Sequence, residues 1–327
     1  MTTYKSIKGF TVQNLASDPT TASSVGQIYY NSTGNVFKYG VPGVGAWSSG
    51  NNLNTARMAA AGLGIQTAAL LVAGETGSIL GIVEQYNGSS WTEVADINTA
   101  RKANAGSGTT TAGLTFGGAI GPPGRYQDLN EIWNGSGWTE VADLNTGRNG
   151  LGGAGTATAA LAMGGIISTG VTAINESYNG TSWTELNDLN TARESAASGG
   201  TSTSAIFAGG LTTVPVANVE TWDGTSWTEV AEINSARSIL GGTAEDATNS
   251  IIFGGRTPPG VDVAITESWN GSAWTEVADL ATSRDYTQGA GASNTSAICM
   301  GGFTPPVTNA TEEWTLPDVA IKTITTS

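Results

Sequence analysis

The stretch ESYNGTSWTELNDLNTAR, residues 176–193, decides the fold because the chain repeats it with small changes. Its Trp-Thr-Glu core recurs every 44 to 47 residues, and an arginine follows each tryptophan ten residues later. The core starts at Trp91, Trp138, Trp183, Trp227 and Trp274, with Trp47 in the equivalent frame; the arginines are Arg57, Arg101, Arg148, Arg193, Arg237 and Arg284. A period of this length indicates an array of similar supersecondary units.

The rest of the unit has the pattern of short strands. Small residues follow the arginine, an apolar run then ends in a glycine pair, and Glu-x-Tyr or Glu-x-Trp closes the unit. Apolar runs such as Ala205–Ala208 are bounded by glycine and are too short for helices. In five copies, Asn-Gly or Asp-Gly joins the closing aromatic residue to the next tryptophan. This pairing predicts a tight hairpin with a type I′ turn.

Four strands per unit, with no segment of helical period, predict an all-β fold, a β-propeller of four-stranded antiparallel blades. The strand after the arginine consists of small residues, as at Ala59–Gly62, and is expected to be innermost, where blades crowd around the axis. Tryptophans and tyrosines on the outer strands would fill the widening wedge between blades.

These residues resemble the Kelch repeat, in which a glycine pair, an aromatic residue and a tryptophan follow one another across two strands. The resemblance covers residues 55–318. Kelch repeats resemble the propeller of galactose oxidase, whose copper site needs two histidines and a tyrosine–cysteine crosslink. Because this chain has no histidine, that activity is not expected. The sialidase-type aspartate box is absent as well, since Thr221–Trp227 lacks the residue that separates Asp from Gly.

The two ends of the chain depart from the repeat. Residues 25–39 read as a hairpin and resemble the leading segment of bacteriophage virion proteins, particularly the repeat proteins of marine phages. We therefore divide the chain into an N-terminal hairpin segment, 1–46, which contributes to the closing blade, and a Kelch-like propeller, 47–327. Chain length favours seven blades, with six as the alternative if the Trp47 strand completes the sixth. In both cases the N- and C-terminal strands close the ring, which hides sheet edges.

Composition limits the function. The 327 residues include 13 Lys and Arg, 27 Asp and Glu, one cysteine and no histidine. A net charge of −14 without a basic cluster argues against nucleic-acid binding. The missing histidines remove the commonest general base and metal ligand. No stretch is long enough for a membrane helix, and residues 1–30 lack a signal-peptide pattern, so we expect a soluble protein made in the host cytoplasm.

The repeated charges have two interpretations. The acids could form a cation-binding or catalytic ring, and the six arginines could bind an anion. Repetition in every unit favours a structural role instead, with each arginine satisfying carbonyls or a glutamate where blades meet. The sequence therefore predicts no catalytic residue, metal or cofactor. Cys299 is expected in the core, and the Asn-Gly-[Ser/Thr] sequons are explained by the turn, because Asp223 stands in the same position.

Symmetry is broken in the loops between the second and third strands of each unit, which vary in length and are rich in proline. Variable loops on a rigid scaffold are where binding commonly resides, although they could equally be plain connectors. These loops and the Asn-Thr-Ala-Arg connectors are expected on one face, and the Asn-Gly turns on the other. Tyrosine and arginine are enriched among interface hot spots. The predicted binding residues are Arg125, Tyr126, Arg256 and Phe303.

These observations lead to a functional hypothesis. The chain is expected to be a non-enzymatic structural or attachment protein of a phage virion, a tail, fibre or capsid component. Its partners would be other virion proteins or a host-surface glycan or protein, with oligomer formation left open. A cellular Kelch-type protein- or glycan-binding adaptor is the alternative. A carbohydrate-active enzyme is a weaker one, because the acids are symmetric and histidine is absent.

Overall fold

The computed structural model describes residues 12–20, 24–121, 125–317 and 319–325. The described chain is all-β, and no helix in it is long and apolar enough to cross a membrane. It divides into two compact units. The first comprises Met1–Gly45 and Leu316–Ser327, and the second comprises Ala46–Thr315.

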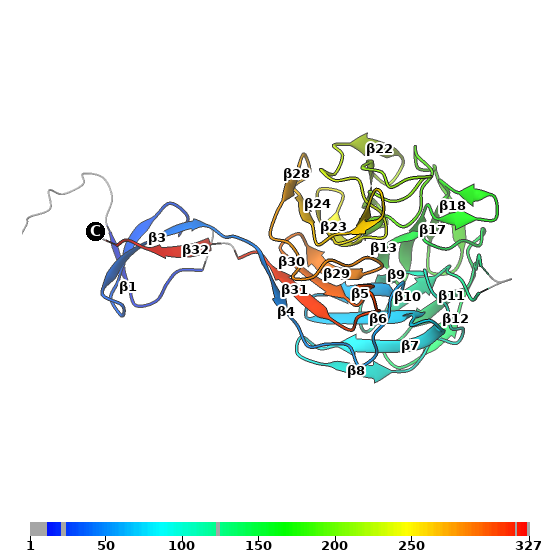
Figure 1. Ribbon diagram of the computed structural model, residues 1–327, viewed down its shortest axis with the longest axis horizontal. Helices are drawn as coiled ribbons and strands as arrows, with labels where there is room; N and C mark the ends of the chain where they lie inside the picture. The colour runs from blue at the N-terminus through cyan, green and yellow to red at the C-terminus, as the bar shows by residue number, and fades with distance from the viewer. Residues whose placement is uncertain (1–11, 21–23, 122–124, 318, 326–327) are drawn as a thin grey trace, which may run out of the picture. The chain divides into compact units, whose positions relative to one another are not determined.

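Within the described residues, the second unit contains six four-stranded antiparallel sheets, arranged in chain order (Figure 1). The first three are β5 (Ala61–Ile65), β6 (Ala68–Glu75), β7 (Ile79–Tyr86) and β8 (Trp91–Val94); β9 (Ala105–Gly108), β10 (Gly113–Phe116), β11 (Asn130–Trp133) and β12 (Trp138–Glu140); and β13 (Gly152–Thr156), β14 (Ala159–Met163), β17 (Asn175–Tyr178) and β18 (Trp183–Glu185).

The other three sheets repeat this order. They are β19 (Ala197–Thr201), β20 (Ser204–Ala208), β21 (Val219–Trp222) and β22 (Trp227–Val230); β23 (Gly241–Asp246), β24 (Asn249–Phe253), β27 (Thr266–Trp269) and β28 (Trp274–Glu276); and β29 (Gln288–Ser293), β30 (Ser296–Met300), β31 (Thr311–Thr315) and β4 (Ala46–Ser49). Two short hairpins, β15 (Ile166–Ile167) with β16 (Gly170–Val171) and β25 (Arg256–Thr257) with β26 (Val261–Asp262), project from the loops between second and third strands.

Backbone hydrogen bonds connect the residues just before the six first strands into a closed circuit, which we call the mouth circuit. Each amide donates to the equivalent carbonyl of the preceding sheet at 2.7 to 3.2 Å, and the amide of Ala59 donates to Tyr286, which returns the circuit to its start. The mouth circuit consists of Ala59, Ala103, Gly150, Ser195, Ile239 and Tyr286. The circuit ties the sixth sheet to the first.

Apolar cores lie between neighbouring sheets. One core joins Leu161 and Met163 of β14 to Phe207 and Trp222 of the next sheet. Another joins Ile298 and other residues of the sixth sheet to residues of the first. The first strands carry small residues and the later strands carry the large aromatic ones, so the size gradient expected from the sequence is present.

Each repeated arginine is buried beside the glutamate of the third strand in its own sheet, an arrangement we call the Arg–Glu clamp. In the second sheet, Nη1 of Arg101 lies 2.6 Å from Oε1 of Glu131, and Oε2 of Glu131 accepts hydrogen bonds from the backbone and side-chain amides of Asn98 at 2.7 and 2.8 Å. The six clamps are Arg57–Glu84, Arg101–Glu131, Arg148–Glu176, Arg193–Glu220, Arg237–Glu267 and Arg284–Glu312. Each clamp fastens the connector that enters a sheet to that sheet's third strand.

The predicted type I′ turn is wrong. Gly88 has a positive φ of 87°, but Asn87 is not among the residues with positive φ, which a type I′ turn requires at both positions. Tyr86 pairs with Trp91, so four residues form the loop. The side-chain oxygen of Asn87 accepts hydrogen bonds from the backbone amides of Ser89 and Ser90 at 3.0 and 2.9 Å. Asparagine therefore serves as a side-chain acceptor that closes an Asx turn.

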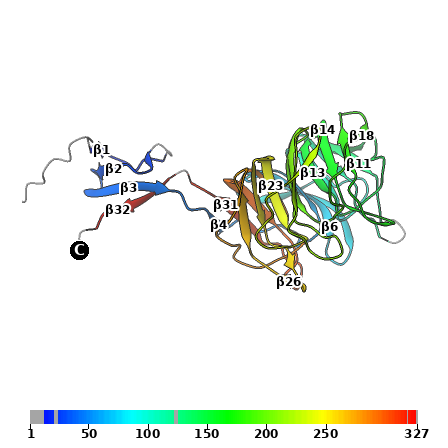
Figure 2. The ribbon, with the colours of Figure 1, turned by 90° about the horizontal axis from the view of Figure 1, so that it is seen from above.

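The N-terminal hairpin and the Trp47 strand lie in different sheets, so they do not build one blade together as the seven-blade arrangement requires. β4 pairs with β31, and Trp47 stands opposite Trp314, so the Trp47 strand completes the sixth sheet. In the first unit, β1 (Gln13–Leu15), β2 (Ile28–Asn31), β3 (Val36–Pro42) and β32 (Val319–Thr323) form a separate sheet. In this sheet β3 and β32, from opposite ends of the chain, lie side by side (Figure 1 and Figure 2).

Candidate functional site

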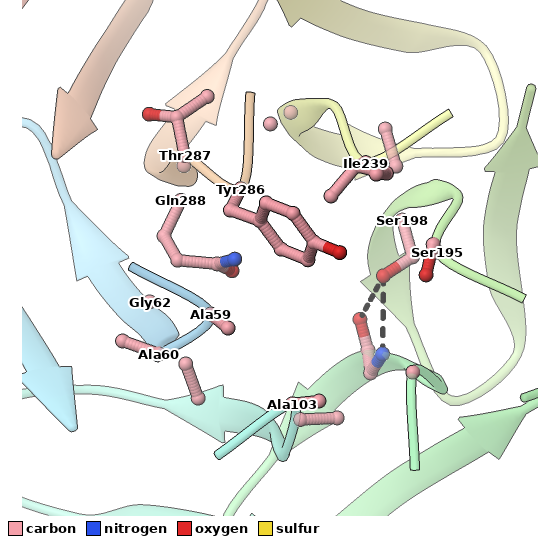
Figure 3. Close-up of a pocket in the computed structure, with 18 of the residues that line it drawn as sticks. Ala59, Ala60, Gly62, Ala103, Ser195, Ser198, Ile239, Tyr286, Thr287 and Gln288 are labelled. Carbon is pink, nitrogen blue, oxygen red and sulfur yellow. Dashed lines mark hydrogen bonds between the residues drawn. The ribbon is translucent and has the colours of Figure 1, made fainter. Parts of the chain in front are cut away.

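The candidate site surrounds the mouth of a cavity of about 120 Å³ in the second unit (Figure 3). The residues that open the first strand of each sheet line this cavity, and most of them are glycine, alanine or serine. Ser198 joins two sheets here, because its hydroxyl donates to the carbonyl of Gly153 at 3.1 Å and accepts from its amide at 3.0 Å. A cavity of this size suits water or a small ion, so a larger ligand would bind at the mouth.

Two large side chains break the symmetry of the mouth circuit. All six of its positions have positive φ; four hold alanine, glycine or serine, whereas Ile239 and Tyr286, with φ angles of +58° and +48°, carry large side chains. The left-handed region is unfavourable for β-branched and bulky residues, so these two positions store backbone strain. The ring of Tyr286 lies across the cavity, with its hydroxyl directed toward the side of Ser195 and Ser198 (Figure 3).

An arginine bridges two carboxylates beside Tyr286. Nε of Arg256 lies 2.8 Å from Oδ1 of Asp262, and Nη2 of Arg256 lies 2.9 Å from Oδ2 of Asp285 in the next sheet. Asp285 is completely buried. Burial and the neighbouring charge of Asp262 raise the pKa of Asp285 to about 6, although Arg256 opposes the shift. This ion triad links the fifth sheet to the sixth.

Further charged residues are next in the chain to members of the mouth circuit, since Lys102 precedes Ala103 and Glu194 precedes Ser195. Burial raises the pKa of Glu194, while the positive charge of Arg125 counteracts that shift. Nζ of Lys102 lies 2.6 Å from Oε2 of Glu75. Burial raises the pKa of the Tyr286 phenol, the negative charges of Asp285, Glu194 and Glu75 raise it further, and the positive charge of Arg256 opposes them. The mouth therefore combines one aromatic ring with charged groups from several sheets.

The four predicted binding residues lie in loops between second and third strands, on the side of the sheets where the connectors enter. Isolated backbone bridges join Ser238 to Arg256 and Asp285 to Phe303, so connectors and loops meet there. Arg256 forms an ion pair with Asp285, which precedes Tyr286 of the mouth circuit. Phe303 is half-buried and exchanges backbone hydrogen bonds with Asp285 at 2.8 and 3.2 Å.

Arg125 and Tyr126 lie together in the loop of the second sheet. The Arg125 guanidinium stands 5.8 Å from the centre of the Tyr126 ring, and Asn149 donates to the Arg125 carbonyl at 2.6 Å. Arg125 is exposed and Tyr126 is half-buried. Pro122, Pro123 and Gly124 of the same loop lie outside the described residues.

Sequence reasoning missed Tyr286, Asp285 and Glu194. A signal for them exists, because the two positions after each repeated arginine vary strongly among copies that are otherwise alike. These pairs are Met58-Ala59, Lys102-Ala103, Asn149-Gly150, Glu194-Ser195, Ser238-Ile239 and Asp285-Tyr286. Variation inside a strict repeat marks a position that the scaffold does not determine.

Cys299 is buried and free, and its thiol lies 2.9 Å from the hydroxyl of Thr287. Across the described ranges, no group of three or more His, Cys, Asp or Glu side chains is placed to hold a metal ion. No protein-family model matches the chain, and no curated protein matches it.

Proposed function

We propose that the second unit is a six-bladed Kelch-like propeller that serves as a non-enzymatic binding module. The closed mouth circuit, the cores between neighbouring sheets and the pairing of β4 with β31 support six blades in a ring. Six equivalent clamps provide a rigid frame, and rigid frames present binding loops at low entropic cost.

The observation that carries the binding role is the concentration of variable features on the connector side, which we call the mouth face. The second unit contains nine Lys and Arg residues, and six of them belong to the clamps. The other three, Lys102, Arg125 and Arg256, all lie beside the connectors on the mouth face, where Asn149 of a connector donates to the Arg125 carbonyl. The opposite face, which we call the turn face, carries the turns between first and second strands and five near-identical Asx turns between third and fourth strands.

Exposed apolar side chains support the same face. The large exposed hydrophobic residues in the described part of the second unit are Ile65, Ile120, Val214 and Val261, and the last three lie in loops between second and third strands. Isolated exposed apolar residues are common, but their repeated occurrence around one mouth, with Tyr286 and paired charges, is typical of an interaction surface.

We further propose that the chain is a virion component that contacts a host surface or a neighbouring virion protein through the mouth face. The resemblance of residues 25–39 to phage virion proteins supports this location. A cellular binding adaptor is the second candidate, since the same mouth face would serve it.

The test incubates fluorescently labelled full-length chain with intact host cells and, separately, with purified phage particles. Saturable binding to either supports the proposal, and detection of the chain in purified particles by mass spectrometry assigns it to the virion. Absence of saturable binding to both, or turnover of glycosidase or oxidase substrates by the purified chain, would contradict it.

A further inference from the structure

Among the described residues, the sheet of the first unit has one apolar face open to solvent. In the β2–β3 register, Ile28 stands opposite Tyr39 and Tyr30 opposite Phe37. Residues directly opposite each other on neighbouring strands share a face, and every second residue along a strand returns to it. These four apolar side chains therefore lie on the same side of the sheet.

The two flanking strands extend this side, which we call the open face. Asn14 pairs with Tyr30, and Tyr39 pairs with Lys322. Alternation then adds Val12 on one flank and Ile324 on the other, with Asn14 and Lys322 as polar residues at the rim. The apolar members of the open face include Val12, Ile28, Tyr30, Phe37, Tyr39 and Ile324, and the same alternation adds Val41 opposite Ala320.

The apolar side chains of the open face are well exposed to solvent. Ile28 is 51% exposed, Phe37 48%, Val12 45%, Ile324 41% and Tyr39 38%. Tyr30 packs edge-on against Phe37 at 5.2 Å, but nothing in the described chain covers the pair.

The other face is closed by the preceding chain segment. Asp18 accepts hydrogen bonds from the Tyr29 hydroxyl at 2.8 Å and the Asn31 amide at 2.6 Å, and it pairs with Lys38 at 2.7 Å. Tyr29 and Asn31 are accordingly 2% and 6% exposed. A sheet with one closed and one open apolar face lacks the second layer that such structures need.

We propose that the open face is a self-association interface on which a second copy of this chain packs its own open face. Two equivalent sheets packed face to face stand about 10 Å apart and interdigitate their side chains into a shared core. The same patch would serve both copies around a two-fold axis.

Area and size support a second copy as the occupant. Half-exposure of five large side chains leaves about 400 Å² of apolar surface per chain, by the usual area of such residues. An interface of standard size buries about 800 Å² per partner, of which somewhat more than half is apolar. The first unit, Met1–Gly45 with Leu316–Ser327, is also short enough that a single core is marginal.

Charge favours contact through this unit. By sequence, the first unit carries four lysines against two aspartates, whereas the second carries nine Lys and Arg against 25 Asp and Glu. Two first units carry a much smaller net charge than two second units, so repulsion opposes contact through the open faces far less than contact through the second units.

Sedimentation velocity on the full-length chain across about 1 to 100 μM tests the proposal. We expect the mass of two chains for the wild type and of one chain for Phe37→Glu, with a dissociation constant raised at least about a hundredfold by the buried charge. Gln13→Glu is the matched control, because Gln13 is exposed on the opposite face and pairs with Tyr29. This control should associate like the wild type.

A crosslinking experiment keeps the proposal testable even if the Phe37→Glu variant does not fold. Because Cys299 is buried, Ile28→Cys introduces the accessible thiol, and a short bismaleimide should join two Ile28→Cys chains but not two Gln13→Cys chains. A wild type that stays monomeric throughout the range, or equal crosslinking of the two cysteine variants, would overturn the proposal. Dimers that appear only after deletion of residues 1–11 would also overturn it, since the chain's own N-terminus would then be the occupant.

Discussion

At the scale of single residues, the Arg–Glu clamp is the device on which the repeat depends. In the fourth sheet Arg193 donates to Glu220 and to the carbonyls of Thr191, Gly209 and Phe207, at 2.9 to 3.0 Å for the carbonyls. Burial lowers the pKa of Arg193, and the hydrogen bond and the charge of Glu220 partly oppose that shift. Removal of one partner would leave the other charge buried without compensation.

Arg193→Met should therefore lower the free energy of unfolding by about 3–5 kcal/mol, the usual cost of an orphaned buried charge. Arg125→Met is the matched control, because Arg125 is exposed and should change stability by less than about 0.5 kcal/mol. Urea denaturation followed by tryptophan fluorescence measures both values. Equal effects of the two substitutions would show that the clamp contributes little.

Ionisation of Asp285 makes the free energy of unfolding depend on pH, and the direction follows from the raised pKa of this residue. Its pKa is raised from 3.8 to about 6 in the folded chain, so the folded state binds more protons than the unfolded state between those values. The contribution is fully present below pH 3.8 and is lost as pH rises through about 6. Stability from this group falls with rising pH across that window.

Asp285→Asn should remove this component, so the wild-type unfolding free energy minus that of the variant should fall as pH rises from about 4 to 6. Chemical denaturation at several pH values measures the difference. Glu276→Gln, at an exposed position, should leave the wild-type pH profile unchanged. A difference that rises with pH would contradict the assignment.

At the scale of elements, the glycine pair that follows the second strand in five of the six sheets, with Ala73-Gly74 in its place in the first, fixes how one sheet meets the next. The amide of Gly210 donates to the carbonyl of Arg237 in the following connector at 2.9 Å. Gly210 has a φ of 106°, and a Cβ placed on it would stand 2.7 Å from the carbonyl oxygen of Glu194. Both its backbone conformation and its close approach therefore require glycine.

Gly210→Ala should destabilise the chain by about 1–3 kcal/mol, because it combines an unfavourable φ with a backbone clash. Gly137→Ala is the matched control, since no atom lies within 4 Å of its Cβ position and equivalent turns hold serine or alanine there. Thermal unfolding should rank the control at or slightly above the wild type. A tolerated Gly210→Ala would show that this junction is not constrained.

The sequence predicts the elements well where one local pattern determines them. Trp-Thr-Glu strands, apolar second strands and their order follow from periodicity, and each copy reinforces the others. The Asn87 turn was misassigned because an Asn-Gly pair suits both a type I′ turn and an Asx turn, and only loop length separates them. Tyr286 and Asp285 escaped notice because their role depends on charges brought together from several sheets, which spacing along the chain does not reveal.

At the scale of the whole molecule, a strand from the N-terminal side completes the last sheet of the second unit. Trp47 packs edge-on against Phe253 at 4.9 Å and donates to Thr266 at 3.0 Å, so it also contacts the fifth sheet. The sheet that the Trp47 strand joins could not be determined from chain length, because the N-terminal segment is long enough for either arrangement. It depends on the pairing of β4 with β31, which are far apart in the sequence.

Truncation isolates this closing strand. A chain of residues 46–315 retains β4, whereas a chain of residues 50–315 lacks it. The shorter chain should be less stable by at least about 3 kcal/mol, because loss of the Trp47 contacts opens a large cavity and exposes the edge of β31. Thermal unfolding of the pair measures the loss, and equal midpoints would argue against closure by β4.

The most direct test of the account compares binding of labelled full-length chain to intact host cells by flow cytometry after substitutions on opposite faces. Arg125→Ala with Tyr126→Ala and Phe303→Ala removes predicted anchors from the mouth face and should weaken binding at least about thirtyfold with little change in thermal unfolding. Ser89→Ala with Ser136→Ala and Thr181→Ala changes exposed residues of the turn face and should bind like the wild type. Normal binding by the mouth-face variant, or loss of binding by the turn-face variant, would contradict the assignment of the mouth face as the binding surface.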